Sequence, residues 1–185
     1  MENTSIAEII RKRRTIHQFR PQQCPPQEEI MAAIEHAIWA PNHYKTEPWK
    51  FYLIGDDTKE KICQLNAELV RNKHSDKAAD IKLKRWREIP GWLLLSCNKS
   101  DDEIRAREDF ASCCCAAQNL MLYLWNMDIG VKWTTGEVIR EQKFFEIMGI
   151  DNSRESVVGL FWYGYPDEIP QMSRPSLEQI VIELP

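Results

Sequence analysis

The apolar residues of two long segments recur at every third or fourth position, which is the spacing of one face of an α-helix. In QEEIMAAIEHAIWAP, residues 27–41, this spacing predicts an amphipathic helix that ends before Pro41. In residues 104–127 the apolar face is wider, and it comprises Phe110, Cys113, Cys114, Ala117, Leu120, Met121, Leu124 and Met127. A helix that is apolar over so wide an arc is expected at the centre of the core.

Three short apolar runs have the length and composition of buried strands: WKFYLIG (49–55), IPGWLLLSC (89–97) and SVVGLFWYGYP (156–166). VKWTTG, residues 131–136 after the long helix, predicts a further short strand or an extended turn. The intervening pattern is helical, mostly polar in residues 56–89, with a short helix ending at Gly149. No two strands are joined by a hairpin signal, so an α+β fold or a three-layer αβα sandwich is expected.

The two ends of the chain carry weaker patterns. A first helix is predicted to start at Thr4 or Ser5 and to reach about Arg13, because Ser5 and Glu8 have the spacing of a capping box. From Asp167 onward prolines interrupt the chain before it ends in IVIELP. This tail is expected to lie along a surface, and a partner's surface is one option.

Composition narrows the classes of protein without naming a function. The 185 residues, 43% hydrophobic and 28% charged, allow one sizeable core, so a single domain spanning residues 1–185 is expected. No apolar run reaches the roughly 20 residues of a membrane helix. The first residues lack the basic and apolar regions of a secretory leader, so a cytoplasmic protein without a membrane partner is expected.

The six cysteines show no paired C-x-x-C spacing, which argues against a zinc or iron–sulfur site, and no metal is expected. Cys113, Cys114 and Cys115 are consecutive in a predicted helix and point in different directions. They are interpreted as small apolar residues with reduced thiols, which suits the cytoplasm.

The segment KRRTIHQFR, residues 12–20, concentrates four Lys or Arg and one His in a chain of net charge -4. Glycine-rich phosphate motifs are missing and Gly totals only 7, so a phosphorylated cofactor would have to be held by side chains. Arg13, Arg14 and Thr15 supply two planar forks and a hydroxyl suited to phosphate. The alternative is that these cations only cap the carbonyl end of the first helix, which its dipole favours.

The loop WAPNHYKTEPWKF, residues 39–51, is dense in flat and hydrogen-bonding groups. Connecting loops normally carry small polar residues, so Asn42, His43 and Tyr44 indicate a binding surface for a flat molecule with polar edges. The alternative is that Trp49 packs inward at the start of a strand and the other side chains are solvated.

These segments, in this order, resemble the nitroreductase family of flavoproteins. The family has a helix ending in R-R-S-x-R or a near variant, then A-P-S/D-x-x-x-x-[QE]-P-W-x-F, matched here by residues 40–51. ASCCCAAQNLMLYLWNMDIGVKW resembles its central helix and following strand, VVGLFWYGYPDE its late strand, and SRPSLEQIV its closing segment. The resemblance implies a mixed, mostly antiparallel central sheet flanked by helices.

The resemblance also implies FMN bound at a homodimer interface, reduced by NADH or NADPH and reoxidised by a small-molecule substrate. No side chain of the protein acts as a nucleophile in such a reaction. Arg13, Arg14, Thr15 and Arg174 would hold the phosphate and ribityl chain. Asn42 and His43, with Trp39 beside them, would reach the flavin from the other subunit. The flavin edge would be lined by Trp133, Thr134 and Thr135.

Two departures from the family pattern concern the flavin. His17 stands where many members have a second arginine near the pyrimidine edge, so it would give a weaker, pH-dependent donor. Asn42 replaces the frequent Ser or Asp. Both changes are compatible with FMN binding, and they affect the redox potential of the flavin and the substrate preference.

Residues 71–88 hold seven Lys or Arg against three acids. A nucleic-acid surface is one interpretation, but a solvated helix is favoured, so no nucleic-acid partner is expected. A third option is that Lys73, Lys77 and Arg85 attract NADPH or an anionic substrate.

The expected activity is reduction of nitroaromatic, quinone-like or related acceptors. The alternatives are a reductive dehalogenase or flavin-modifying enzyme of the same fold, or a non-catalytic flavin- or anion-binding module. The T-E-P-W stretch also resembles the deiodinase branch of the family.

Overall fold

The computed structural model describes residues 5–185, so the alternative helix start at Thr4 lies outside the described residues. Helix α1 (Ile6–Lys12) begins after Ser5, whose hydroxyl accepts the Glu8 N–H at 3.3 Å while the Glu8 carboxylate accepts the Ser5 N–H. The expected capping box is therefore formed. It fixes where α1 starts, and hence where the cationic segment after α1 begins.

Four strands form the central sheet: β1 (Trp49–Leu53), β2 (Gly91–Asn98), β3 (Gly130–Thr134) and β4 (Glu155–Gly164). Their order is β1-β2-β4-β3, and every neighbouring pair is antiparallel. Thr15 and Val131 form an isolated parallel β-bridge, so the sheet is mixed at this edge. The expected α+β fold with a mostly antiparallel sheet is confirmed. No two strands that follow each other in the chain form a hairpin in the described residues, because helical segments separate them.

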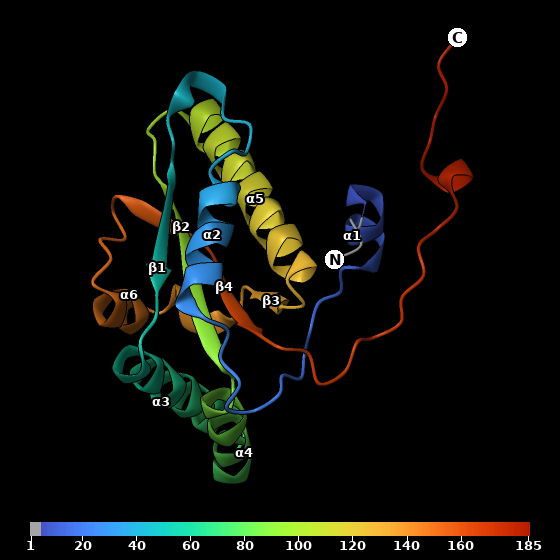
Figure 1. Cartoon of the computed structure of the whole chain (residues 1–185). Helices are drawn as coiled ribbons and strands as arrows, with labels where there is room; N and C mark the ends of the chain where they lie inside the picture. The colour runs from blue at the N-terminus through green and yellow to red at the C-terminus, as the bar shows by residue number, and fades with distance from the viewer. Residues whose placement is uncertain (1–4) are drawn as a thin grey trace.

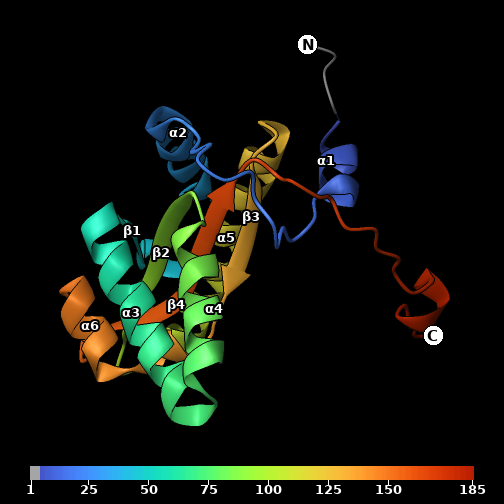
Figure 2. The ribbon, with the colours of Figure 1, turned by 90° about the horizontal axis from the view of Figure 1, so that it is seen from below.

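Helices cover both faces of the sheet, as the three-layer expectation requires (Figures 1 and 2). Helices α2 (Gln27–Ala37) and α5 (Glu103–Asn126) pack on one face. Helices α3 (Asp56–Lys73), α4 (Asp76–Arg87) and α6 (Gln142–Met148) pack on the other face. Strand β2 is buried on both sides: Leu93 and Leu95 face α2 and α5, whereas Trp92 and Leu94 face the other layer. Burial on both faces explains its continuous apolar run.

Short 3-10 helices complete the chain: η1 (His43–Lys45), η2 (Glu137–Arg140) and η3 (Leu177–Gln179). The single helix expected before Gly149 is divided into η2 and α6, and Gly149 ends it in the left-handed region with φ 65°. Helix α2 ends at Ala37, and a turn leads to Pro41, because a residue that precedes proline disfavours helical geometry.

A β-bulge in β4 shapes the sheet beside β3. Leu95 pairs with Gly159 and Ser96 with Val157, so Val158 is the extra residue. Gly159 is required there, because a Cβ atom at this position would lie 2.0 Å from Nε1 of Trp133. The bulge and the glycine together make room for the Trp133 indole.

Helix α1 and the tail after Pro166 lie apart from the three layers. In Figures 1 and 2 both segments extend from the same side of the molecule. Helix α1 has no buried residue, and every residue from 171 to 185 is exposed. Most of their apolar side chains are exposed in the described part of the chain.

Candidate functional site

Arg13 occupies the C-cap of α1, where its side chain is half-buried. Among residues 5–185 its guanidinium has no hydrogen-bond or ion-pair partner. Burial, followed by the positive charges of Arg14 and Arg174, lowers the pKa of Arg13. Arg174 belongs to the C-terminal tail, so guanidinium groups from both ends of the chain lie within electrostatic reach of one another. Like charges gathered in this way create a positive potential that favours an anion.

Arg14 uses part of its guanidinium inside the chain. Its Nη1 donates to the carbonyl oxygen of Arg11 at 2.6 Å and to its neighbour Arg13's carbonyl at 2.9 Å. This is the capping interaction that the sequence offered as the alternative to phosphate binding. Arg13 and Arg174 keep their forks free of such contacts within the described chain.

The segment after Arg13 lies against the start of β3. Ile16 is fully buried and its N–H donates to the Val131 carbonyl at 3.1 Å, while Thr15 forms the bridge to Val131. Thr15 and His17 flank this anchor and are exposed. Both side chains are therefore available to a ligand lying along the edge of β3.

His17 lies in a cationic environment. Burial lowers its pKa below the ordinary 6.5, and the charges of Lys132 and Arg85 lower the pKa further. The ring is therefore mostly neutral at pH 7, with one N–H donor and one acceptor nitrogen.

Trp133 packs inward from β3 and does not present its ring to solvent. Its indole stacks on Phe161 with centroids 5.3 Å apart, and Nε1 donates to the Val158 carbonyl at 3.2 Å. Thr134 and Thr135 follow at the end of the strand, and the Thr135 carbonyl accepts from Nη2 of Arg140 at 2.8 Å. The hydroxyls of the two threonines make no hydrogen bond with the rest of the described chain, so they remain free for a ligand.

The loop after α2 is fixed by the Asn42 side chain. Its Nδ2 donates to the hydroxyls of Thr46 at 3.1 Å and Ser112 at 3.2 Å, and its Oδ1 accepts the Glu47 N–H at 2.7 Å. The Thr46 hydroxyl also donates to the buried carboxylate of Asp109 on α5. Asn42 therefore holds the loop together.

The loop backbone is strained and the network opposes its relaxation. Tyr44, Lys45 and Glu47 have φ values of 63°, 54° and 45°, a region that residues other than glycine seldom adopt. Strain of this kind is found at binding and catalytic sites, where the surrounding structure imposes it.

The strained loop presents aromatic side chains outward. Trp39 is 83% exposed and Tyr44 66% exposed. The His43 ring stacks on Tyr44 with centroids 3.9 Å apart and its Nδ1 lies 2.9 Å from a carboxylate oxygen of Glu108. Trp49, by contrast, packs against the core, as the alternative interpretation of this loop stated for that residue.

Apart from the residues of β3 and those that follow it, the predicted site residues form two groups toward different ends of α5. In the loop group (Trp39, Asn42, His43), Asn42 and His43 contact the first half of this helix, whereas α1 lies nearer its other end (Figure 1). From Ser112, which Asn42 contacts, to the end of α5 at Asn126 the helix rises about 21 Å at 1.5 Å per residue. Within one chain the two groups do not meet.

The structure adds polar residues that the sequence did not single out. Asp109 and Ser112 are buried and hold the loop, and they stand three residues apart in the otherwise apolar α5 pattern. That spacing is a signal that could have found them. Lys132 lies beside His17 through the pairing of β3 with the segment after α1, and nothing local in the sequence reveals this.

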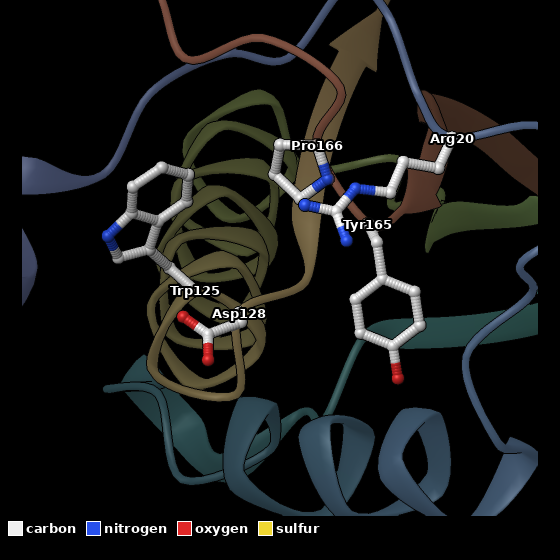
Figure 3. Close-up of a pocket in the computed structure, with 5 residues that line it drawn as sticks. All are labelled: Arg20, Trp125, Asp128, Tyr165 and Pro166. Carbon is white, nitrogen blue, oxygen red and sulfur yellow. The ribbon is translucent and has the colours of Figure 1, made fainter.

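A cavity of about 390 Å³ lies where the end of α5 meets the two terminal segments. Figure 3 shows Arg20, Trp125, Asp128, Tyr165 and Pro166 around it. Arg20 and Asp128 form no ion pair in the described part of the chain. None of the predicted site residues lines this cavity. Trp125 lines it from the outward face of α5.

Residues 5–185 lack two further features. No group of three or more His, Cys, Asp or Glu side chains is arranged to hold a metal ion there. None of the helices there combines the length and the apolar character needed to cross a membrane.

Known proteins share both the sequence pattern and the fold. The sequence profile of the Nitroreductase family matches residues 10–165. The Bacillus subtilis (strain 168) protein YfhC, provisionally named an NAD(P)H nitroreductase, is 29% identical over 178 residues, covering 94% of this chain and 90% of that protein.

Two crystal structures illustrate the structural likeness. A nitroreductase-like family protein from Bacillus cereus has a TM-score of 0.85 at 28% identity, covering 99% of this chain and 98% of that one. A Desulfovibrio desulfuricans protein in complex with FMN, provisionally described as a nitroreductase, has a TM-score of 0.77 at 22% identity, with coverage of 99% and 98%. At that identity the second likeness concerns the fold.

Proposed function

Because the chain belongs to the nitroreductase family, we propose that it is an FMN-dependent oxidoreductase that takes electrons from NADH or NADPH. Its acceptors would be nitroaromatic, quinone-like or related small molecules. The relative YfhC carries an NAD(P)H nitroreductase name, and the D. desulfuricans neighbour was solved with FMN. The observation in this chain that supports the proposal is that the positive charge of Arg174 acts on the half-buried Arg13.

The arginines fit the phosphate of FMN. That phosphate is dianionic, and planar guanidinium forks donate paired, charge-assisted hydrogen bonds to its oxygens. Arg13 is half-buried among like charges with no carboxylate paired to it in residues 5–185, so an arriving phosphate would relieve the repulsion. Thr15, two residues further along, would meet the ribityl chain.

We place the flavin ring along the outer edge of β3. From Arg13 to His17 the chain spans at most about 13 Å at roughly 3.3 Å per residue, enough to follow the cofactor from phosphate to ring. The free hydroxyls of Thr134 and Thr135 then lie at the far end of the same strand. The Trp133 indole supports this strand from behind by its bond to Val158.

FMN, when bound, supplies transfer of a hydride from the nicotinamide and of electrons to the acceptor. The chain binds the cofactor, orients it and adjusts the charge around it. His17, mostly neutral, would donate one N–H to the pyrimidine edge, and Lys132 beside it would supply positive charge where the reduced ring carries negative charge. No nucleophilic side chain of the protein takes part.

We propose that a second copy of the chain completes the site. Asn42 and His43 contact the first half of α5, whereas α1 lies toward its other end, so we infer that these residues and Trp39 reach a flavin across an interface. The strained loop in which they lie is already fixed, and its aromatic side chains point outward. A two-fold arrangement would bring the loop of each protomer to the arginines of its partner.

The termini supply the apolar surface for such an interface. Large apolar side chains of α1 and the tail are 53–86% exposed: Ile6, Ile10, Ile169, Met172, Leu177, Ile180, Val181, Ile182 and Leu184. A stretch of exposed apolar residues this long marks an interaction surface. Strand β1 pairs only with β2 in the described chain, so its open edge could receive residues 180–184 of a partner as an added strand.

The six free cysteines agree with a reducing compartment, and we include a cytoplasmic location and a single domain over residues 1–185 in the proposal.

Absorption spectroscopy of the purified protein tests the proposal. A yellow protein whose flavin band is bleached by NADH or NADPH, and restored by a nitroaromatic or a quinone, supports it. A yellow protein that neither nicotinamide bleaches would be a binding module. A colourless protein that takes up no added FMN would contradict every flavin-based function.

A further inference from the structure

Five of the seven cations of residues 71–88 fall into two sets, one paired with acids and one facing other cations. Arg71 pairs with Asp76 at 2.8 Å, Lys73 with Glu137 at 2.5 Å, and Arg87 with Glu60. These pairs belong to exposed surfaces, where such contacts contribute little to stability. They remove Lys73 from the residues expected to attract an anion.

Lys82 and Arg85 form the second set, and they face cations in place of acids. Lys132 on β3 is half-buried, and burial lowers its pKa. The positive charges of Lys82 and Arg85 lower that pKa further. The pKa of His17 is likewise lowered by burial and then by the positive charges of Lys132 and Arg85. None of these four side chains has an ion-pair partner in the part of the chain that the structure describes.

The geometry of this cation cluster (His17, Lys82, Arg85, Lys132) is set by buried tryptophans. The Lys132 Nζ lies 4.9 Å from the centre of the Trp162 ring, and the Lys82 Nζ lies 6.0 Å from that of Trp86. The two rings pack edge to face with centroids 5.0 Å apart. The lysines are therefore held toward each other over one tryptophan surface, and α4 cannot separate them without losing these contacts.

A cleft opens beside the cluster. Its volume is about 400 Å³, and His17 and Arg85 line it together with Gln18, Phe19, Glu88, Ile89 and Asp167. Glu88 and Asp167 are the acidic groups of this cleft, and neither forms an ion pair with Arg85. The lining of the cleft therefore holds two acids and one arginine that is unpaired within residues 5–185, and the excess positive charge of this region comes from Lys82 and Lys132 next to Arg85.

We propose that Lys82, Arg85 and Lys132 bind the anionic group of the second ligand of the site. This ligand is the electron donor or the acceptor, and its anionic group is a phosphate or a carboxylate. The inference rests on the proposed function, because His17 belongs both to this cluster and to the segment that would carry FMN. A cofactor held from Arg13 to His17 would end beside the cluster, so an anion bound there would be positioned next to the ring.

The alternative is a solvated helix end, since Lys84, Arg85 and Arg87 occupy the last turn of α4, where the helix dipole favours cations. A matched pair of double variants separates the two. K82Q/R85Q removes two charges from the cluster, and K77Q/K84Q removes two exposed charges from the same helix that do not face Lys132 or His17. General electrostatic attraction changes equally in both variants.

Calorimetric titration of the FMN-loaded proteins with NADP⁺, NAD⁺, 4-nitrobenzoate and neutral 4-nitrobenzamide gives the readout. K82Q/R85Q is expected to bind at least one anionic probe roughly tenfold more weakly than K77Q/K84Q does, with unchanged affinity for the amide. Loss for NADP⁺ alone identifies the donor's extra phosphate, and loss for both dinucleotides identifies the pyrophosphate. Loss for the nitrobenzoate identifies an acceptor carboxylate.

Equal affinities of the two double variants for every anionic probe would overturn the inference. A loss of FMN from K82Q/R85Q would overturn it too, because the cluster would then hold the cofactor. Failure of the proposed function appears separately, as wild-type protein that takes up no FMN. In that protein the same probes are titrated without FMN, and they then test only whether the cluster binds an anion.

Discussion

Substituting Gly159 with alanine tests how β3 is held behind the proposed flavin position. The added Cβ would lie 2.0 Å from Nε1 and 2.4 Å from Cδ1 of Trp133. Both atoms belong to a rigid ring that already stacks on Phe161, so no flexible side-chain end can give way. The indole must move, and its bond to the Val158 carbonyl at 3.2 Å must break.

These contacts set the expected loss in the free energy of unfolding. Loss of a half-buried hydrogen bond costs about 1 kcal/mol. Forcing an extra methyl group into a packed site costs about 1–3 kcal/mol. We therefore expect the free energy of unfolding to fall by about 3 kcal/mol in Gly159→Ala. Since Thr134 and Thr135 directly follow Trp133, FMN should also bind more weakly, by roughly tenfold for about 1.4 kcal/mol.

Urea denaturation followed by tryptophan fluorescence measures the first effect, and a lower midpoint with unchanged slope is expected. Gly136→Ala is the matched control, because the nearest atom to its new Cβ is the Thr134 hydroxyl oxygen at 3.7 Å. If Gly159→Ala and Gly136→Ala unfold within about 0.5 kcal/mol of each other, the account of Trp133 as the support of β3 is refuted.

Three further predictions concern the loop, the buried carboxylate and the tail. Asn42→Ala removes all the hydrogen bonds of that side chain, so amide hydrogen exchange in residues 42–47 should accelerate by at least roughly tenfold; unchanged exchange would show that Asn42 does not hold the loop. Burial raises the pKa of Glu155, but hydrogen bonds from Lys50, Ser96 and Tyr52 outweigh burial and lower that pKa below its ordinary 4.5. The contribution of Glu155 to stability is therefore present above pH 4.5 and is lost as the pH falls through its lower pKa in the folded protein. In Glu155→Gln the free energy of unfolding should therefore depend less on pH in this acidic range. An unchanged pH dependence would contradict this. A chain ending at Pro166 lacks the apolar tail, so it should sediment as a monomer under conditions where the full chain sediments as a dimer; a stable dimer of the shortened chain would exclude the tail from the interface.

Local patterns sufficed for the elements of the fold. The strands β2 and β4 are continuous apolar runs because both of their faces are buried, and a run of that kind is visible in the sequence. The capping box at Ser5 and the left-handed Gly149 were predictable for the same reason, since each depends on residues near it in the chain. The order β1-β2-β4-β3 and the bulge at Val158 depend on distant segments, and no local pattern predicts them.

Local patterns suggested the residue types of the candidate site, but they do not predict how the side chains lie. Trp133 was expected at the flavin edge, yet its ring turns inward because Gly159, distant in sequence, leaves space for it. The positive φ angles of Tyr44, Lys45 and Glu47 carry no glycine signal and arise from the network around Asn42. The proximity of Arg85 to Lys132 depends on how α4 lies over the sheet.

The central claim is that Arg13 and Arg174 together hold the phosphate of one FMN. Removal of their cations should not lower the stability of the FMN-free protein, because the positive charge of Arg13 is disfavoured by burial and by its arginine neighbours. Loss of charge-assisted hydrogen bonds of about 1.5–3 kcal/mol each should nevertheless weaken FMN binding by at least roughly a hundredfold.

The decisive measurement is the dissociation constant of FMN, by fluorescence titration, for Arg13→Ala with Arg174→Ala. The matched control is Arg11→Ala with Arg20→Ala, which removes two exposed arginines whose charges do not act on Arg13. We predict that the first pair loses FMN on dialysis while the control keeps it and both unfold at similar urea concentrations. If the two pairs retain FMN equally well, the phosphate is bound elsewhere.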